Sequence, residues 1–288
     1  MLPFRKILFP VDFSERCRAI APIVAQTVDK FGAELYLLHA VDPIPMVMSP
    51  IEPSITAAMP DFAELRRYQT ERLHGFQREF FPGAKPTVIV EVGDAATLVR
   101  QFIRHQGVDL VMLPTHGRGG FRRFLLGSVA AKILHDVDCA VWTDAHRVEG
   151  QPAFPYRRIL CSLDVNDEEA PAILRGACSI ATTYGAELTL VHAAETPPAG
   201  WEGDYAAFRD DAVEAATKQM LSLRDATGVQ APFQIPFGFP DEEVRRVALK
   251  EHADLIVTGR GRAQTRLARI WSNLYSIIRE APCPVLSI

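Results

Sequence analysis

A ten-residue segment occurs twice in this chain of 288 residues, and that repeat limits which folds are possible. Residues 31–40 read FGAELYLLHA and residues 184–193 read YGAELTLVHA. Shorter pairs follow in the same order: RKILFPVDF with RRILCSLDV, VDLVM with ADLIV, and CAVW with CPVL. A repeat of about 150 residues is too long for a solenoid unit and has the size of one domain. We therefore expect two similar domains, residues 1–150 and 151–288, joined near Gln151–Pro155.

The hydrophobic pattern of each half predicts an α/β fold. Short, nearly continuous apolar runs alternate with stretches whose apolar residues recur at helical spacing, which is typical of βαβ units around a buried parallel sheet. We expect strands at 6–11, 34–39, 87–91, 110–113 and 139–143, and again at 159–163, 187–192, 233–236, 255–258 and 284–287. Helical spacing covers 20–28, 62–80, 98–103 and 129–134 of the first half.

Composition excludes several classes of protein. A net charge of −4 provides no overall basic field for nucleic acid, and no apolar run approaches the ~18–20 residues of a membrane span. The N-terminus does not have the pattern of a signal peptide. The five cysteines are widely spaced without a CxxC motif, which indicates neither a disulfide framework nor a zinc site. We expect a reduced, cytoplasmic protein with no membrane span, no metal site and no nucleic-acid partner.

The segment Asp42–Pro60 departs from the alternating pattern. It holds five prolines and three methionines in nineteen residues, and proline at that density prevents regular structure. A loop of this length commonly serves as a lid or a contact surface. Its counterpart in the second half, Glu195–Gly203, is shorter.

Asp12 lies where the first expected strand ends. One interpretation is a helix N-cap, because Glu15 three residues later completes a capping-box pattern. The other is a ligand contact, because open α/β sheets bind ligands beyond the carboxyl ends of their strands, where a carboxylate can accept hydrogen bonds from ribose hydroxyls. Asp164 is the equivalent residue in the second half.

A glycine-rich segment, PTHGRGGFRRFLLGS, follows the fourth expected strand. Gly117, Gly119 and Gly120 allow tight backbone turns whose N–H groups can face an anion. Gly127 and Ser128 then open a helix, where free amides and the helix dipole favour phosphate. A solvated surface loop with a serine cap is the competing interpretation. His116 and Arg118 in the same loop could neutralise phosphate charge or simply be solvated, as we expect for Arg122 and Arg123.

Motifs of established catalytic chemistry are missing from the sequence. There is no Walker A loop, no GxGxxG, no HExxH and no GxSxG, so metal-dependent or nucleophilic catalysis has no support and we assign no catalytic residue. His39 and His192 end the repeated GAEL strand, and we interpret both as structural.

These segments in this order resemble the universal stress protein family in a tandem form. The resemblance covers nearly the whole chain and rests on ILFPVDFS, LLHAVD, PTHGRGGFRRFLLGSVAAKIL and APCPVL. It implies two tandem Rossmann-like, HUP-type sandwich domains. Each has a five-stranded parallel sheet in the order 3-2-1-4-5, and a pseudo-twofold relates the two. Family members associate through their fifth strands, which in a tandem chain implies an intramolecular pseudo-dimer, with a further homodimer left open.

The resemblance also implies a nucleotide site in the first half. ATP-binding members carry a G-x-x-G-x9-G-S/T pattern, and here Pro114 replaces its first glycine while Gly117 and Gly127 keep the spacing. By position, Asp12 would bind ribose and the Val41 backbone would hold adenine. Phosphate and flanking contacts would come from Gly117, Gly127, Ser128, the Val129 amide, Pro10, Val11, His116 and Arg118. The cofactor would be ATP, with or without Mg²⁺.

The second half departs from that pattern at the equivalent stretch, Gly259-x-Gly261-x9-Trp271-Ser272. One residue is missing between the glycines, and an indole stands where a glycine belongs. We therefore expect no nucleotide there.

Three functions remain open from the sequence. The first is a cytoplasmic stress-response regulator that binds an adenine nucleotide in its first domain, contacts an unnamed protein partner and at most hydrolyses ATP slowly. The second is an interaction or small-molecule or lipid carrier protein of the same fold, with the proline- and methionine-rich loop as its contact surface. The third, an enzyme related to ATP pyrophosphatases or flavoproteins, has the least support because PVDFSE stands where their glycine-rich loop would be.

Overall fold

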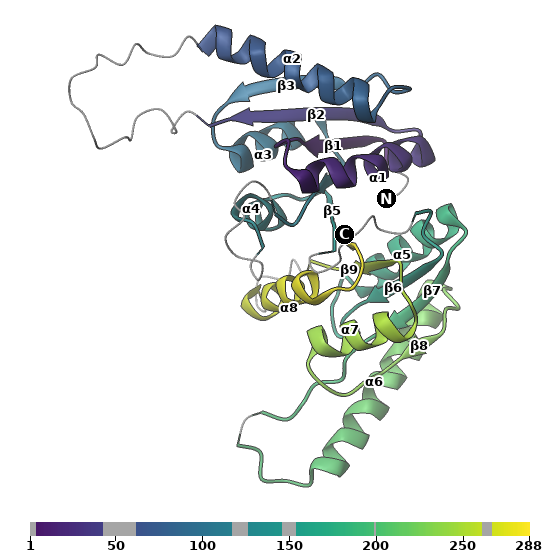
Figure 1. The fold of residues 1–288 in the computed structure, drawn as a ribbon. Coiled ribbons are helices and arrows are strands. Elements are labelled where there is room, and N and C mark those ends of the chain that lie inside the picture. Colours follow the sequence, from purple (N-terminus) through teal and green to yellow (C-terminus); the bar gives the residue numbers. More distant parts are fainter. Residues whose placement is uncertain (1–3, 43–61, 117–125, 146–153, 199, 261–266) are drawn as a thin grey trace, which may run out of the picture. The chain divides into compact units, whose positions relative to one another are not determined.

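A computed structural model describes residues 4–42, 62–116, 126–145, 154–198, 200–260 and 267–288, with side chains from residue 273 onward in the last range (Figure 1). The chain divides into two compact units. The N-terminal unit comprises Phe4–Arg123 and Gly127–Cys139, and the C-terminal unit is built mainly on Ala140–Ile288. The expected domain boundary near residue 150 and most of the expected linker lie outside the described residues.

Strands and helices alternate through both halves. The first half contains β1 (Lys6–Pro10), α1 (Glu15–Phe31), β2 (Glu34–Val41), α2 (Phe62–Phe80), β3 (Thr87–Val92), α3 (Ala95–Gln106), β4 (Leu110–Leu113), α4 (Ser128–Asp136) and β5 (Ala140–Thr143). The second contains β6 (Arg158–Ser162), α5 (Ala170–Tyr184), β7 (Glu187–Val191), α6 (Tyr205–Thr227), β8 (Phe233–Gln234), α7 (Pro240–Lys250), β9 (Leu255–Thr258), α8 (Leu267–Glu280) and β10 (Val285–Ser287).

The sheet topology confirms the expected fold class. In the N-terminal unit the strand order is β3-β2-β1-β4, and each printed pairing is parallel. The second half has the order β8-β7-β6-β9-β10, again with parallel pairs, which is the predicted 3-2-1-4-5 arrangement. The order reverses beside the first strand of each repeat, between β1 and β4 and between β6 and β9. These are the positions at which open α/β sheets form ligand sites.

The fifth strand of the first repeat lies in the C-terminal unit. There β5 pairs antiparallel with β10, with Trp142 opposite Leu286. The Ser287 hydroxyl donates to the Val141 carbonyl oxygen at 3.2 Å, a buried polar contact across this pairing. The strand that closes the first sequence repeat therefore completes the edge of the second repeat's sheet.

The repeated GAEL segment has a clear structural cause. Its glycine ends the helix before β2 and before β7, with Gly32 at φ 60° and Gly185 at φ 67°. This left-handed conformation carries a steric penalty for residues with a Cβ, which is why glycine is the common helix C-cap. The apolar residues that follow enter the buried strand, so the repeat encodes a helix end, a turn and a core strand.

Helices cover both faces of the N-terminal sheet. Helix α2 packs on one face, where Phe9 of β1 contacts Phe76 and Phe81 at ring-centroid distances of 6.1 and 6.3 Å. Helix α3 packs on the other, where Phe102 meets Tyr36 of β2 at 5.3 Å. The strands between the two layers are almost fully buried, which explains their continuous apolar sequences.

Candidate functional site

The candidate site lies at the carboxyl edge of the N-terminal sheet, where β1 and β4 run side by side. Their parallel register pairs Ile7 with Leu110 and Leu8 with Val111, so both strands end at the same edge. Asp12 follows β1, and the segment beginning at Pro114 follows β4. On the other side of β1, β2 ends at Val41. Three separate parts of the sequence that were expected to contribute to the site therefore lie at the same edge of one sheet.

Asp12 is not the N-cap of α1. The cap is Ser14, whose hydroxyl accepts a hydrogen bond from the Cys17 amide at 3.1 Å. Asp12 is half-buried, and its Oδ1 accepts from the Ser14 amide at 2.9 Å. The capping interpretation of Asp12 is wrong because a hydroxyl two residues later caps the helix. Asp12 instead orders the turn between β1 and α1.

The residue after Asp12 has an unusual backbone. Phe13 has φ 61°, a conformation that costs a non-glycine residue free energy unless its surroundings hold it. Its ring lies 4.7 Å from the His39 ring and 5.9 Å from Phe76, and the Arg72 guanidinium sits 4.0 Å from its centroid. These contacts fix the turn that carries Asp12. Sequence reasoning missed both Phe13 and Arg72, since no local pattern links residues on a turn and a distant helix.

His39 and His192 occupy equivalent buried positions. His39 Nδ1 lies 2.7 Å from the Val11 carbonyl oxygen, and His192 Nδ1 lies 3.2 Å from that of Leu163. Burial lowers the pKa of His192, an effect that the nearby Asp164 carboxylate partly opposes. Each imidazole thus links the second strand of its repeat to the turn after the first strand, which is a structural role.

Val41 ends β2 at the same edge and is buried. Its carbonyl oxygen accepts a hydrogen bond from the Gly93 amide at 2.9 Å, which ties the end of β2 to the turn after β3. At the end of β1, Pro10 is half-buried, and the Val11 amide donates to the Leu38 carbonyl oxygen at 2.8 Å. The backbone at these three residues is therefore held by the sheet and its extensions.

Gly127 and Ser128 form the start of helix α4. Gly127 is the N-cap residue and provides no side-chain capping bond, and its amide donates to the Thr115 carbonyl oxygen at 2.8 Å. Ser128 is the first helical residue, and Ser128 and Val129 are both exposed. The first amides of a helix have no intrahelical acceptor. This helix start therefore presents donors and a positive dipole end beside the buried Thr115.

The expected phosphate loop begins directly after β4. Gly117 and Arg118, together with Gly119, Gly120, Arg122 and Arg123, lie outside the described residues. His116 is half-buried, with Nδ1 3.3 Å from Thr115 Oγ1. Pro114, the residue that replaces the first glycine of the pattern, is buried at the end of β4.

The second half differs from the first at the positions equivalent to Asp12 and Ser128. Asp164 Oδ1 accepts from the Asn166 amide at 2.9 Å, while the N-cap of α5 is Glu169. Ser272 lies inside α8, which begins at Leu267, whereas Ser128 is the first residue of α4. A Cβ on Gly259 would come within 2.2 Å of Ile173 Cδ1, so this glycine allows close packing against α5.

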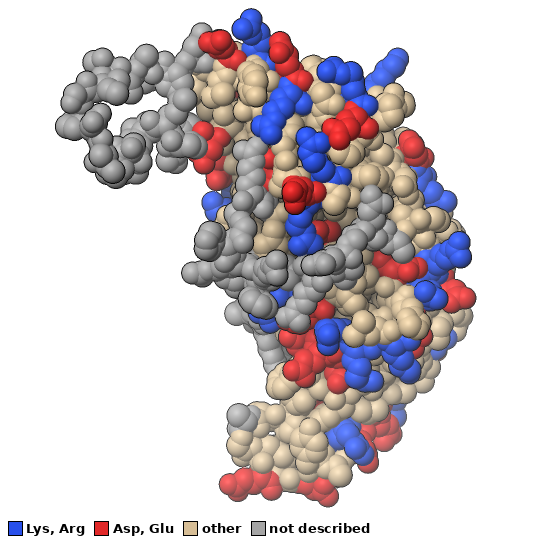
Figure 2. All heavy atoms as spheres, in the orientation of Figure 1, with Lys and Arg blue, Asp and Glu red and all other residues tan. Residues whose placement is uncertain are grey.

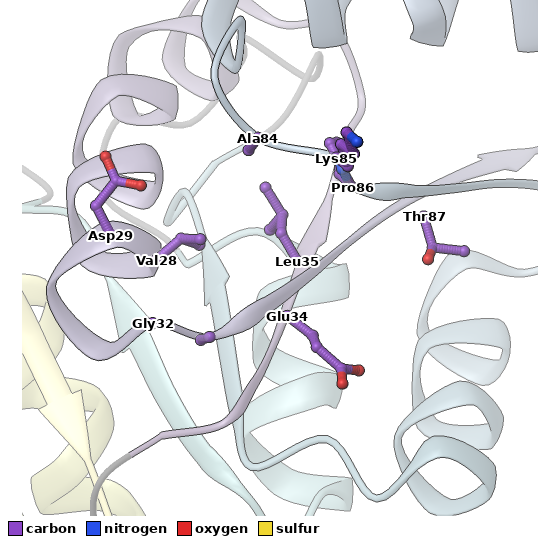
Figure 3. Close-up of a pocket in the computed structure, with 10 residues that line it drawn as sticks. Val28, Asp29, Gly32, Glu34, Leu35, Ala84, Lys85, Pro86 and Thr87 are labelled. Carbon is purple, nitrogen blue, oxygen red and sulfur yellow. The ribbon is translucent and has the colours of Figure 1, made fainter.

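One described pocket lies away from this edge. It has a volume of about 420 Å³ and is lined by residues at the amino-terminal ends of β2 and β3, including Glu34 and Thr87, and by the end of α1 (Figure 3). Across the described ranges there is no group of three or more His, Cys, Asp or Glu side chains that could hold a metal ion. Within the same residues no helix is long and apolar enough to cross a membrane.

Comparison with known proteins gives one consistent family. The sequence profile of the universal stress protein family matches residues 3–143 and again residues 155–288. A universal stress protein of Methanocaldococcus jannaschii is 28% identical over 138 residues, which is 48% of this chain and 80% of that protein. The crystal structure of a universal stress protein from Archaeoglobus fulgidus covers 98% of this chain and 95% of its own, with a TM-score of 0.67 and 20% identity. A universal stress protein solved in complex with cAMP covers 46% of this chain and 97% of its own, at 17% identity and a TM-score of 0.36.

Proposed function

The chain belongs to the universal stress protein family in a tandem form, and on that premise we propose that it is a regulator that binds one adenine nucleotide in its first half. The regulatory role would follow from a nucleotide-dependent change in partner choice, with Asp42–Pro60, which follows Val41 in the sequence, as the contact segment. The two repeats would act as an intramolecular pseudo-dimer in the cytoplasm. Any ATP hydrolysis would be slow, as the resemblance to the family implies.

The observation that carries this proposal is the start of α4. Gly127 caps the helix without a side chain, and its amide is bonded to Thr115 directly after β4. A backbone without Cβ permits a phosphate to approach the amides of Ser128 and Val129 closely, and the helix dipole favours the negative charge. Gly117 and Arg118 would complete the phosphate contacts from the loop, with His116 at its entry.

Asp12 and Val41 would position the nucleoside. Asp12 Oδ1 accepts from the Ser14 amide. A carboxylate is an acceptor at both oxygens, which suits the hydroxyl donors of a ribose. The Val41 backbone would face the adenine, with Pro10 and Val11 as neighbouring contacts. Mg²⁺, where present, would enter with the phosphates, since the described protein groups form no metal cluster of their own.

The second half would not bind nucleotide. Ser272 lies inside α8, so its amide is part of the helix interior and not of a helix start. Amides in a helix interior donate to carbonyl groups four residues earlier and are not available to a phosphate. Asp164 would then serve only the turn that it makes with Asn166.

Isothermal titration calorimetry on the full-length chain tests the proposal. Titration with ATP and Mg²⁺ is expected to give saturable heat with a stoichiometry of one per chain and a dissociation constant in the micromolar range, about −8 kcal/mol at 1 μM. AMP and cAMP belong in the same series, cAMP because a relative has been solved with it. No heat with any of the three at millimolar concentration would reject nucleotide binding and favour the carrier function. Two sites per chain would reject the assignment to the first half alone.

A further inference from the structure

A cluster of aromatic side chains lies at the carboxyl edge of the second sheet, in the unit for which no nucleotide is proposed. Trp201, Tyr205, Phe208 and Phe237 form this cluster, which we call the aromatic platform. Ring centroids are 5.2 Å apart for Trp201 and Phe208 and 5.6 Å apart for Tyr205 and Phe237. Trp201 and Tyr205 are 48% and 56% exposed, and the Phe208 and Phe237 rings between them are 6.3 Å apart. Large aromatic side chains this exposed, and adjacent to one another, indicate an interaction surface.

The platform is built into the fold. A parallel bridge joins Ala194 to Phe237, and the Ala194 amide donates to the Pro236 carbonyl oxygen at 2.7 Å. The Trp201 indole rests on the backbone of Gly203, where a Cβ would come within 2.6 Å of the ring. Asp204 then caps α6 by accepting from the amides of Ala206 and Ala207. The exposed rings are therefore held in place by the sheet and by the start of a long helix.

The sequence segments that carry the platform are rich in acidic residues. Residues 195–211 and 237–243 contain eight acidic residues and one basic residue: Glu195, Glu202, Asp204, Asp210, Asp211, Asp241, Glu242 and Glu243 against Arg209. The guanidinium of Arg209 is bonded to Asp210 at 2.8 Å. Figure 2 shows Asp and Glu side chains at the lower end of the view, around the start of α6. Arg246, just beyond the second segment, pairs with Glu243, so acidic residues outnumber basic ones here and two of the acids carry an arginine partner.

The exposed aromatic rings and the acidic residues together favour one kind of partner. Arginine guanidinium groups stack on aromatic faces and also pair with carboxylates, so aromatic rings on acidic segments suit a segment that bears arginines. Nucleic acid and anionic membranes carry the same sign of charge as these acidic residues, which disfavours both. A second copy would bring equally acidic segments, which disfavours pairing of platform with platform. We propose that the aromatic platform is a docking surface for an arginine-bearing segment of a partner protein.

The chain itself contains this type of contact. Arg72 lies 4.0 Å from the Phe13 ring centroid, and Arg224 lies 5.4 Å from that of Phe233. The docking surface does not depend on nucleotide binding, because it lies in the other repeat and uses none of the residues of the candidate nucleotide site.

Fluorescence anisotropy of a labelled twelve-residue peptide that repeats Arg-Leu-Gly tests this inference on the full-length protein. Saturable binding is expected, weaker at high salt. Trp201→Ala and Tyr205→Ala should each weaken binding about tenfold, which corresponds to about 1.4 kcal/mol. Gly203→Ala, which displaces the indole and leaves every charge in place, should also weaken it. Tyr68→Ala is the matched control, because Tyr68 is 61% exposed in the other unit, and it should leave binding unchanged.

Several outcomes would overturn the inference. These are no saturable binding at about 1 mM protein, equal binding of a peptide with Glu in place of Arg, or full binding by folded Trp201→Ala protein. Circular dichroism melts of each variant establish that it is folded. A dimer in analytical ultracentrifugation that Trp201→Ala converts to monomer would assign the platform to self-association instead.

Discussion

The indole Nε1–H of Trp142 donates to the hydroxyl of Tyr156 at 2.9 Å, and both side chains are buried. Trp142 lies on β5, the last strand of the first repeat, and Tyr156 precedes β6, the first strand of the second. Tyr156 also packs edge-on against Tyr184 with ring centroids 5.0 Å apart. Burial raises the pKa of Tyr156 well above its usual range, so its hydroxyl stays protonated. This bond joins the two repeats inside one hydrophobic core.

Tyr156→Phe should destabilise the C-terminal unit. The change removes the acceptor and leaves the buried Trp142 donor without its partner, which costs about 1–3 kcal/mol. Urea unfolding followed by circular dichroism measures the loss, and Tyr68→Phe on an exposed side chain is the control. In the double variant with Trp142→Phe the unpaired donor is gone, so the combined cost should be less than the sum of the single ones. Additive costs would contradict a direct bond.

The cysteines should divide into two reactivity classes. Burial raises the pKa of the Cys17, Cys161 and Cys283 thiols to about 12, so almost no thiolate is present at pH 8. Cys139 and Cys178 are only half-buried. Iodoacetamide labelling of the folded protein, mapped by mass spectrometry, should modify Cys139 and Cys178 first. Labelling of Cys161 at the same rate would contradict the packing of β6.

Stability should depend on pH through His192. Burial lowers its pKa in the folded state below the unfolded value of about 6.5. Above pH 6.5 both states are neutral and the stability is fully present. As pH falls below that value, the unfolded state binds a proton first and the free energy of unfolding decreases, by at most about 1.4 kcal/mol per pH unit.

His192→Asn tests this dependence. Asparagine can keep a donor near the Leu163 carbonyl oxygen but cannot bind a proton in this range. The stability difference between wild type and His192→Asn should therefore narrow between pH 7 and pH 5 in urea unfolding. His74→Asn makes the same substitution at an exposed imidazole and is the control, for which the stability difference from wild type should not change with pH. A constant difference across that range would contradict a buried neutral His192.

Gly127→Val should remove ATP binding without unfolding the protein. Gly127 has φ −58° and ψ 143°, which valine adopts without strain. A loss of affinity would therefore come from the valine side chain blocking the phosphate, and not from a change in the backbone. We expect affinity to fall at least about tenfold by calorimetry. Gly75→Ala is the control, because a Cβ there meets no atom within 4 Å. Unchanged affinity for Gly127→Val would place the phosphates elsewhere.

Long periodic segments and buried strands were predictable from the sequence. Helix α2 spans Phe62–Phe80 and β4 spans Leu110–Leu113, both as predicted, because local periodicity and continuous apolar runs determine them. Strand β8 is shorter than expected, Phe233–Gln234, because Pro232 and Pro236 on either side lack the amide that a ladder needs.

Features that depend on tertiary packing were not predictable. The N-cap of α1 is Ser14 and not Asp12. Both side chains are suitable caps, and the geometry of the turn decides between them. The contact of Arg72 with Phe13 joins a helix to a turn far away in sequence. The start of α8 at Leu267, ahead of Ser272, differs from the start of α4 at Ser128, and no local sequence pattern fixes where the second helix begins.

The central claim is that one adenine nucleotide binds in the first half of the chain and none in the second. A crystal structure with a slowly hydrolysed ATP analogue and Mg²⁺ tests it most directly. The account predicts phosphate density at the amides of Ser128 and Val129, ribose beside Asp12, and no nucleotide beside Ser272. Nucleotide beside Ser272, or density in which Asp12 and Gly127 touch no part of the ligand, would contradict it.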